Sequence, residues 1–293
     1  MSIYDVFNKG KKEVESFDTF DKKAWAEQKQ AQRQAAYELI EQTSQLMAKN
    51  PQAFKQYLNV QQQFDRYTAT NAILVSAQMP QATQLKSFRD WKDSRIYVNP
   101  NPTKVLIIEP GNQYQREDGT TATSFNAKEV YDISQTSARI KTEGMEQKPM
   151  RELLAALIKA SPVEFQPIDD IEVPAYYDPS QRIIFLSKDL SENELFNSMA
   201  LEVAAAIYDI KHNEDRETSG FKSYCVSYML SQKYGVDTSV FSFGQLPPEL
   251  TEMEQLAFRS ELNSMRDVLG EIHNEMYKEL EKTKPEKAKD QAR

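Results

Sequence analysis

Basic and aromatic side chains alternate within one short interval of the sequence, residues 66–95. The cations are Arg66, Lys86, Arg89, Lys92 and Arg95, and the rings are Tyr67, Phe88 and Trp91. Binding of a single nucleic-acid strand uses this combination, because cations follow the phosphates while bases stack on flat rings. The simpler interpretation places Phe88 and Trp91 in the core. On that interpretation Arg66 caps a helix or pairs with Asp65 or Asp90.

Two amide side chains in the same interval could add hydrogen bonds to a nucleic acid. Asn71 and Gln78 are seven residues apart, so on a helix they lie on the same face, two turns apart. Carboxamides placed in this way can bond base edges or sugars.

The charge of the chain is divided unevenly along its length. The formal net charge of the 293 residues is −8, which by itself argues against a polyanionic partner. Residues 1–150 carry +2 and the remainder −10, whereas residues 49–108 alone carry +5. A face that binds nucleic acid is therefore expected within residues 49–108.

Helices and a small sheet must position these side chains. Residues 24–47 consist largely of good helix formers without Gly or Pro, which predicts one helix. Two shorter helices are expected between Pro51 and Pro80, where apolar residues recur at about helical spacing. The β-branched run after Lys104 and residues 128–133 predict two strands. This part of the chain is therefore expected to be α+β.

The interval resembles the N-terminal domain of the ArdC antirestriction family. The matching residues fall in order at the family's spacing: Arg66, Tyr67, Asn71, Gln78, Pro80, Ala82, Phe88, Trp91, Arg95 and the pair Gln135-Thr136. The resemblance extends over residues 35–140. It implies a domain that binds single-stranded DNA and belongs to plasmids, conjugative elements or phages.

The candidate interface combines the resemblance with the charges. It consists of Arg66, Tyr67, Asn71, Gln78, Lys86, Arg89, Trp91, Lys92, Arg95 and Gln135. Phe64, Leu74 and Phe88 are expected to be largely core residues. One departure from the family is the sequence Asn-Pro-Asn-Pro-Thr-Lys at residues 99–104, which replaces a basic, glycine-rich turn and predicts weaker affinity for DNA.

A second domain is expected after a polar linker at residues 137–149. Its pattern predicts a helix at 150–160, a strand pair within 172–186, and a helix that starts at the capping box Ser191–Glu194 and continues to about residue 211. Another helix fits residues 216–234, ended by Gly235. The pair Pro247-Pro248 precedes a last helical run at 249–282.

The second domain resembles the zincin-like metallopeptidase domain that follows the ArdC-type module. In that domain a helix carries His-Glu-x-x-His and a later helix supplies an acidic third zinc ligand. Here the helix reads Leu201-Glu202-Val203-Ala204-Ala205, and Tyr224 stands at the third-ligand position. Only Glu202 matches, and without a metal-bound water it has no proton to accept. We expect an inactive domain with no metal and no cofactor, in which Tyr224 donates a hydrogen bond to Glu202.

The last helical run carries an apolar seam with coiled-coil spacing. The seam consists of Leu262, Met265, Leu269, Ile272, Met276 and Leu280. Packing across the same chain is the simpler interpretation, and a homodimer or a partner helix is the alternative. The lysine-rich tail after residue 282 is expected to be disordered.

These observations predict an α+β protein in four regions. They are a helical extension (1–34), an ArdC-like domain (35–145), a degenerate zincin-like domain (150–246) with a small sheet, and a C-terminal helix with a basic tail (247–293). The low glycine content excludes glycine-rich phosphate loops. The single cysteine, Cys225, and the lack of an apolar span or signal segment predict a cytoplasmic protein with no membrane partner.

The predicted function is that of a single-stranded-DNA-binding protein of antirestriction type. It would protect the DNA of a mobile element or antagonise host defence. The alternative is an acidic inhibitor that mimics DNA and binds a host defence nuclease through the −10 half of the chain. An active metallopeptidase is disfavoured because the zinc-binding histidines are missing.

Overall fold

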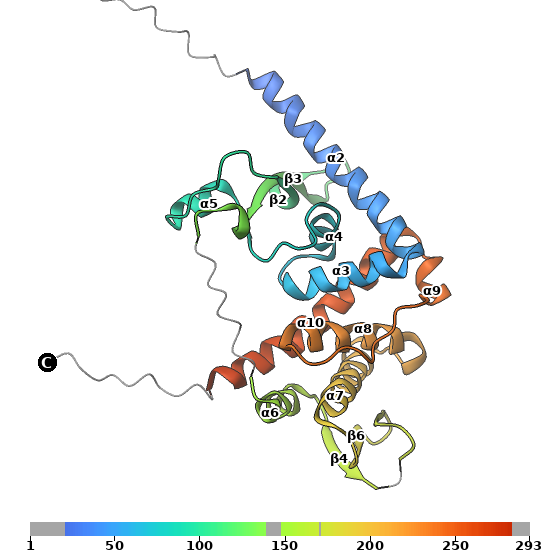
Figure 1. The fold of residues 1–293 in the computed structure, drawn as a ribbon. Helices are drawn as coiled ribbons and strands as arrows, with labels where there is room; N and C mark the ends of the chain where they lie inside the picture. The colour runs from blue at the N-terminus through green and yellow to red at the C-terminus, as the bar shows by residue number, and fades with distance from the viewer. Residues whose placement is uncertain (1–20, 139–147, 170, 283–293) are drawn as a thin grey trace, which may run out of the picture.

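The computed structural model describes residues 21–138, 148–169 and 171–282 (Figure 1). Its first part begins with three helices, α2 (Lys22–Lys49), α3 (Pro51–Gln63) and α4 (Ala69–Gln78). Each helix starts after a polar cap, since the side chains of Asp21, Asn50 and Thr68 accept hydrogen bonds from backbone N–H groups of the first turn. The three helices expected from the sequence are confirmed.

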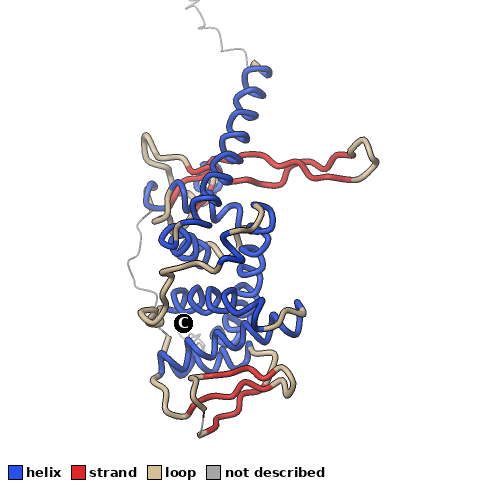
Figure 2. Tube along the Cα trace, turned by 90° about the vertical axis from the view of Figure 1, so that its right-hand side faces the viewer, coloured by secondary structure: helices blue, strands red, loops and turns tan. Residues whose placement is uncertain are grey.

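A three-stranded antiparallel sheet lies beside these helices, with the strand order β1-β3-β2. β2 (Val105–Gln115) and β3 (Thr121–Asp132) form a long hairpin, and β1 (Leu85–Lys86) pairs with the end of β3. The outer half of the hairpin projects away from the helices (Figure 2). The short helix α5 (Phe88–Asp93) packs against β1 and β3, and a 3-10 turn, η2 (Ile133–Gln135), follows β3.

The second part of the chain starts with α6 (Met150–Ala160) and a second small sheet, ordered β4-β6-β5. β6 (Ile183–Ser187) lies between β4 (Glu164–Ile168), which is parallel to it, and β5 (Ala175–Asp178), which is antiparallel. The sequence predicts only the β5–β6 pair. β4 escapes prediction because Pro167 is tolerated in an edge strand but is not typical of strand sequences.

Two helices packed against each other follow this sheet. α7 (Glu192–Ile207) begins at the predicted capping box and lies against β5 and β6. α8 (Arg216–Tyr234) packs against α7 and ends at Gly235, whose φ of 69° is the left-handed conformation of a helix C-terminus. The elements that complete the fold are the π-helical turn η3 (Tyr208–His212), α9 (Pro248–Thr251) and α10 (Gln255–Lys282).

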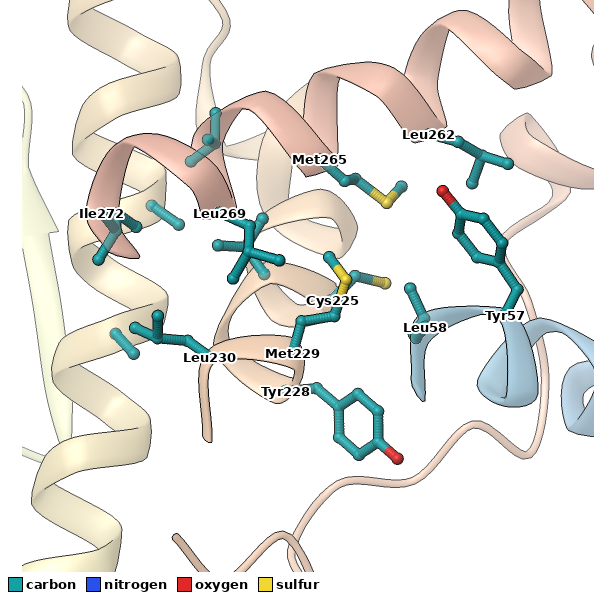
Figure 3. Close-up of a cluster of buried hydrophobic side chains, with 14 of the residues drawn as sticks. Tyr57, Leu58, Cys225, Tyr228, Met229, Leu230, Leu262, Met265, Leu269 and Ile272 are labelled. Carbon is teal, nitrogen blue, oxygen red and sulfur yellow. The ribbon is translucent and has the colours of Figure 1, made fainter. Parts of the chain in front are cut away.

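α10 joins the two parts into one core, because it packs against α2, α3 and α4 as well as α6, α7 and α8. The seam residues are buried along it. Figure 3 shows Leu262 beside Tyr57 of α3 and Met265 beside Cys225 of α8. From Leu262 to Met276 each seam side chain is at most 1% exposed. The seam is therefore packed within the chain, which is the simpler interpretation, and the alternative homodimer through Leu262, Met265, Leu269, Ile272 and Met276 has no exposed seam side chain to use.

The predicted α+β class is confirmed, with differences at element boundaries. α2 passes through residue 34 without a break. The helical run expected at 249–282 is interrupted between α9 and α10. Most of the predicted linker, residues 139–147, and the predicted disordered tail lie outside the described residues. Within the described residues, the helices lack an apolar stretch sufficient to span a membrane.

Candidate functional site

Trp91 fixes α5 to the first sheet. Its side chain is 1% exposed, and its indole N–H donates to the carbonyl oxygen of Tyr131 in β3 at 2.8 Å. The Lys86 ammonium lies over the same ring, 4.8 Å from the centroid, and donates to Ser94 Oγ at 3.2 Å. Trp91 is therefore a core residue. The expectation that it stacks on a base is wrong, because a buried ring offers no free face.

Other side chains of α5 and its C-terminal turn are exposed to solvent. Phe88 is 57% exposed, so the expectation that it is a core residue is also wrong. Tyr97, which is not among the residues expected from the sequence, is 66% exposed. We call the exposed set the α5 surface: Phe88, Arg89, Lys92, Arg95 and Tyr97. Arg89 Nε lies 3.7 Å from a carboxylate oxygen of Asp93, whereas Lys92 and Arg95 form no ion pair with any residue that the structure describes.

Arg95 follows α5 in a left-handed backbone conformation, with a φ of 59°. The helix ends in a Schellman motif, in which Ile96 N–H donates to Trp91 O at 3.0 Å and Arg95 N–H donates to Lys92 O at 2.9 Å. Glycine is the usual residue here, because a Cβ is strained in this conformation. The fold thus holds an exposed arginine on strained backbone, a feature that is concentrated at functional sites.

Arg66 and Tyr67 lie at a different place, after α3. Arg66 is exposed, and Tyr67 stacks on Phe64 with a centroid distance of 5.2 Å and an interplanar angle of 28°. The preceding Asp65 is engaged by Lys233 of α8, at 3.2 Å. Arg66 is therefore held where α3 meets α8 and is not part of the α5 surface.

The amides of Asn71 and Gln78 are used within the fold. Asn71 exchanges two hydrogen bonds with the backbone of Ile108, at 2.9 and 2.8 Å, and Gln78 exchanges two with the backbone of Leu106, both at 2.9 Å. β2 is an edge strand, so the amides replace a neighbouring strand and close its edge. Neither amide is free for a base, which corrects the expectation from the sequence.

The pair Gln135-Thr136 also serves the fold. With its amide oriented to satisfy both polar atoms, Gln135 accepts from Thr103 N–H at 2.7 Å and donates to Thr103 O at 3.0 Å. Thr136 Oγ1 donates to Ile133 O at 2.7 Å. The predicted contact of Gln135 with DNA is therefore corrected to a tie between η2 and the loop before β2.

Glu202 lies inside the second part of the chain, on α7, with its side chain 2% exposed. Its two carboxylate oxygens accept from the two terminal nitrogens of Arg216, each at 2.6 Å, and one of them also accepts from Tyr177 N–H at 2.8 Å. The carboxylate holds the pKa of Arg216 above its ordinary value. The Arg216 guanidinium also lies 5.4 Å from the centroid of the Tyr176 ring. Glu202 is thus inward and paired, as a buried carboxylate must be.

The partner predicted for Glu202 is wrong. The Tyr224 hydroxyl accepts from Ser242 N–H at 2.6 Å and donates to Ser242 O at 3.3 Å. Its ring packs against Phe241 and Phe243, with centroid distances of 5.1 and 5.5 Å. The hydroxyl of Tyr224 is therefore hydrogen-bonded to the loop after α8, and Arg216 at the start of α8 is the partner of Glu202 instead.

The two positions that the resemblance assigns to zinc-binding histidines carry apolar side chains. Leu201 is half-buried and Ala205 is 4% exposed. In the described ranges, no three His, Cys, Asp or Glu side chains gather as a metal site. Sequence reasoning misses Arg216 because its link to Glu202 depends on how η3 turns the chain between α7 and α8, and no spacing in the sequence signals that turn.

His273 of α10 lies in a polar cluster beside α3 and α8. Its Nδ1 is 3.0 Å from the Tyr234 hydroxyl, and its Nε2 is 3.4 Å from the Asp65 carboxylate. Burial, together with the Lys233 ammonium, lowers the pKa of His273 to about 4, although Asp65 acts in the opposite direction. The imidazole is therefore neutral near pH 7 and acts as a structural hydrogen-bond partner.

Comparison with known proteins shows a similarity in fold and none in sequence. No family model and no curated protein matches the sequence. The Mn(II)-bound crystal structure of the antirestriction protein ArdC from the R388 plasmid matches with a TM-score of 0.51 and 13% identity, covering 72% of this chain and 85% of that chain. In fold, the chain is similar to ArdC. The metal-free ArdC structure gives a TM-score of 0.48 and 10% identity, covering 72% and 86% of the two chains.

Proposed function

We propose that this chain is a single-stranded-DNA-binding protein of antirestriction type, carried by a mobile element, whose second part is an inactive metallopeptidase-like region. The α5 surface carries the DNA-binding part of this proposal, because three exposed cations lie there beside two exposed rings. The similarity in fold to a plasmid antirestriction protein supports the antirestriction role.

Fluorescence anisotropy with labelled oligonucleotides tests DNA binding by the full chain. Single-stranded DNA should bind more tightly than duplex of the same length at about 50 mM salt, with an affinity that falls as salt rises because bound phosphates release counterions. Lys92→Ala and Arg95→Ala should each weaken binding about tenfold, because each removes an exposed cation of the α5 surface. Lys159→Ala, which removes one exposed cation from α6, is the matched control and should bind as the wild type does.

Failure of the full chain to bind any DNA at low salt would refute the DNA-binding proposal. The acidic inhibitor would then be favoured, since residues 151–293 carry a net charge of −10. In that case a host nuclease, rather than DNA, should be retained by the protein, and the interaction should weaken at high salt.

The proposed lack of peptidase activity rests on the environment of Glu202. A zincin glutamate must accept a proton from a metal-bound water, but both Glu202 oxygens are engaged by Arg216 and the 201 and 205 positions carry Leu and Ala. Metal analysis of the purified protein should find no stoichiometric zinc, and peptide substrates should remain intact. One equivalent of zinc that a chelator removes together with an activity would refute this proposal.

A further inference from the structure

A trough runs along one face of α2, outside the residues assigned so far. Three hollows of about 420, 420 and 460 Å3 share lining residues, the first two through Gln30 and Arg33 and the last two through Tyr37 and Glu41. The first and last hollows have an opposite wall, formed by the hairpin in both and also by α4 and α10 in the last, whereas the middle hollow is lined by α2 side chains alone. We call this the α2 trough and define it by Trp25, Lys29, Arg33, Tyr37, Phe125 and Arg259.

The α2 members of the trough recur every fourth residue, at positions 25, 29, 33 and 37, which places them on one helix face. From Trp25 to Glu41 the helix rises about 24 Å, at about 1.5 Å per residue. The hairpin is tied to this helix by a 2.9 Å hydrogen bond from Gln32 to Glu129 of β3. The trough is therefore a surface feature that follows α2 from Trp25 to Glu41.

Rings and cations alternate along the trough. Trp25, Tyr37 and Phe125 are 50%, 46% and 42% exposed. Lys29 Nζ donates to Gln32 Oε1 at 3.2 Å, whereas Arg33 and Arg259 have no acidic partner within the described part of the chain. These interspersed charges divide the apolar surface of the trough, so it is not the continuous apolar patch that marks many protein interfaces.

We propose that the α2 trough binds single-stranded DNA, with bases stacked on Tyr37 and Phe125 and phosphates held by Arg33 and Arg259. The proposal rests on the proposed function and names a binding path separate from the α5 surface. Its length accommodates about four nucleotides, the lower end of the site sizes of single-strand-binding folds. The acidic lining residues, Glu38, Glu41 and Glu109, limit the attraction; Glu109 pairs with Lys128 at 2.9 Å, and Glu38 accepts a hydrogen bond from Gln34 at 2.9 Å.

Substitutions in the full chain test the trough by anisotropy with single-stranded DNA. Arg33→Ala, Tyr37→Ala and Phe125→Ala should each weaken binding about tenfold, because each removes one stacking surface or one phosphate contact. Two controls match them in kind, Lys49→Ala on the exposed end of α2 and Tyr277→Ala, a 53% exposed ring on α10. Both controls should keep the affinity within twofold of the wild type.

Tryptophan fluorescence gives an independent readout. Trp25 is half-exposed and Trp91 is buried, so quenching by bound DNA should come from Trp25. Trp25→Phe should abolish the quenching and keep the affinity within about threefold, since a ring remains. Trough variants that bind as tightly as the wild type, with quenching that persists in Trp25→Phe, would overturn the trough and leave the α5 surface standing. No binding by the wild type would overturn both proposals.

Discussion

Arg95→Gly should make the protein more stable while weakening its affinity for single-stranded DNA. The left-handed backbone at φ 59° costs an L-residue about 1 to 2 kcal/mol, and glycine removes that cost. Glycine also gives the unfolded chain more conformational freedom, which lowers the free energy of unfolding by about 0.5 to 1 kcal/mol. The net gain in the free energy of unfolding is about 0.5 to 1 kcal/mol, while loss of the guanidinium weakens DNA binding about tenfold.

Two further variants separate the backbone from the charge. Arg95→Ala removes the same guanidinium but keeps a Cβ, so it should lose the affinity without the gain in stability. Arg182→Gly is the matched control, because Arg182 is exposed in the β5–β6 turn with a φ of 55°. It should be stabilised to the same extent as Arg95→Gly and bind DNA as the wild type does.

Urea denaturation and anisotropy on the same preparations provide the measurements. The stabilised variants should show higher midpoints with unchanged slopes. A lower midpoint for Arg95→Gly would refute the argument from backbone strain. A higher midpoint with unchanged affinity would show that Arg95 is not displayed for DNA binding.

Three other perturbations should give defined results. Arg216→Leu should lower the free energy of unfolding by about 2 to 3 kcal/mol, because it leaves the buried Glu202 carboxylate with one donor. Glu202→Gln should lower it less, by about 1 to 2 kcal/mol, since the half-exposed arginine can be hydrated. Equal losses for the two variants in urea denaturation would contradict this order. Gln78→Leu should cost about 1 to 3 kcal/mol in the same assay by leaving the backbone N–H and C=O of Leu106 without partners, and a neutral result would show that water replaces the amide. The folded-state pKa of His273, about 4, lies below the unfolded value near 6.5, so the unfolded chain binds the proton first and stability falls as pH drops from about 6.5 to 4. Because the imidazole is partly exposed, we expect the free energy of unfolding to fall by about 1 to 2 kcal/mol over this pH range, measured as the difference between the wild type and His273→Gln. Parallel pH profiles of the two proteins would exclude this contribution of His273.

The parts of the fold that depend on local sequence are predictable. Asn50 followed by Pro51 starts α3, and Gly235 ends α8, because caps and breakers act within a few residues of a helix end. The α2, α3 and α4 helices follow from composition and apolar spacing. The apolar seam of α10 is recognisable in the same way, and the simpler interpretation of it, burial within one chain, is confirmed.

The identity of the exposed residues depends on tertiary contacts. Phe88 and Trp91 are three residues apart on a six-residue helix, and either could face the sheet; the acceptor at Tyr131 O favours the side chain that carries an N–H. Asn71 and Gln78 have the polarity expected at an interface with DNA, but their amides are hydrogen-bonded to backbone groups at the edge of β2. These partners come from distant parts of the chain, so spacing within one segment cannot indicate them.

The place of α10 late in the chain affects how the protein folds during synthesis. Residues 255–282 are translated after both preceding parts, yet they complete the cores of both. Until they leave the ribosome, the nascent chain exposes the apolar faces of α3 and α8 that later receive Leu262 and Met265. Such a chain is open to aggregation and to chaperones until α10 is available. A fragment that stops before α10 should therefore be insoluble or dependent on chaperones. In the full chain both cores should be completed together, once α10 is present.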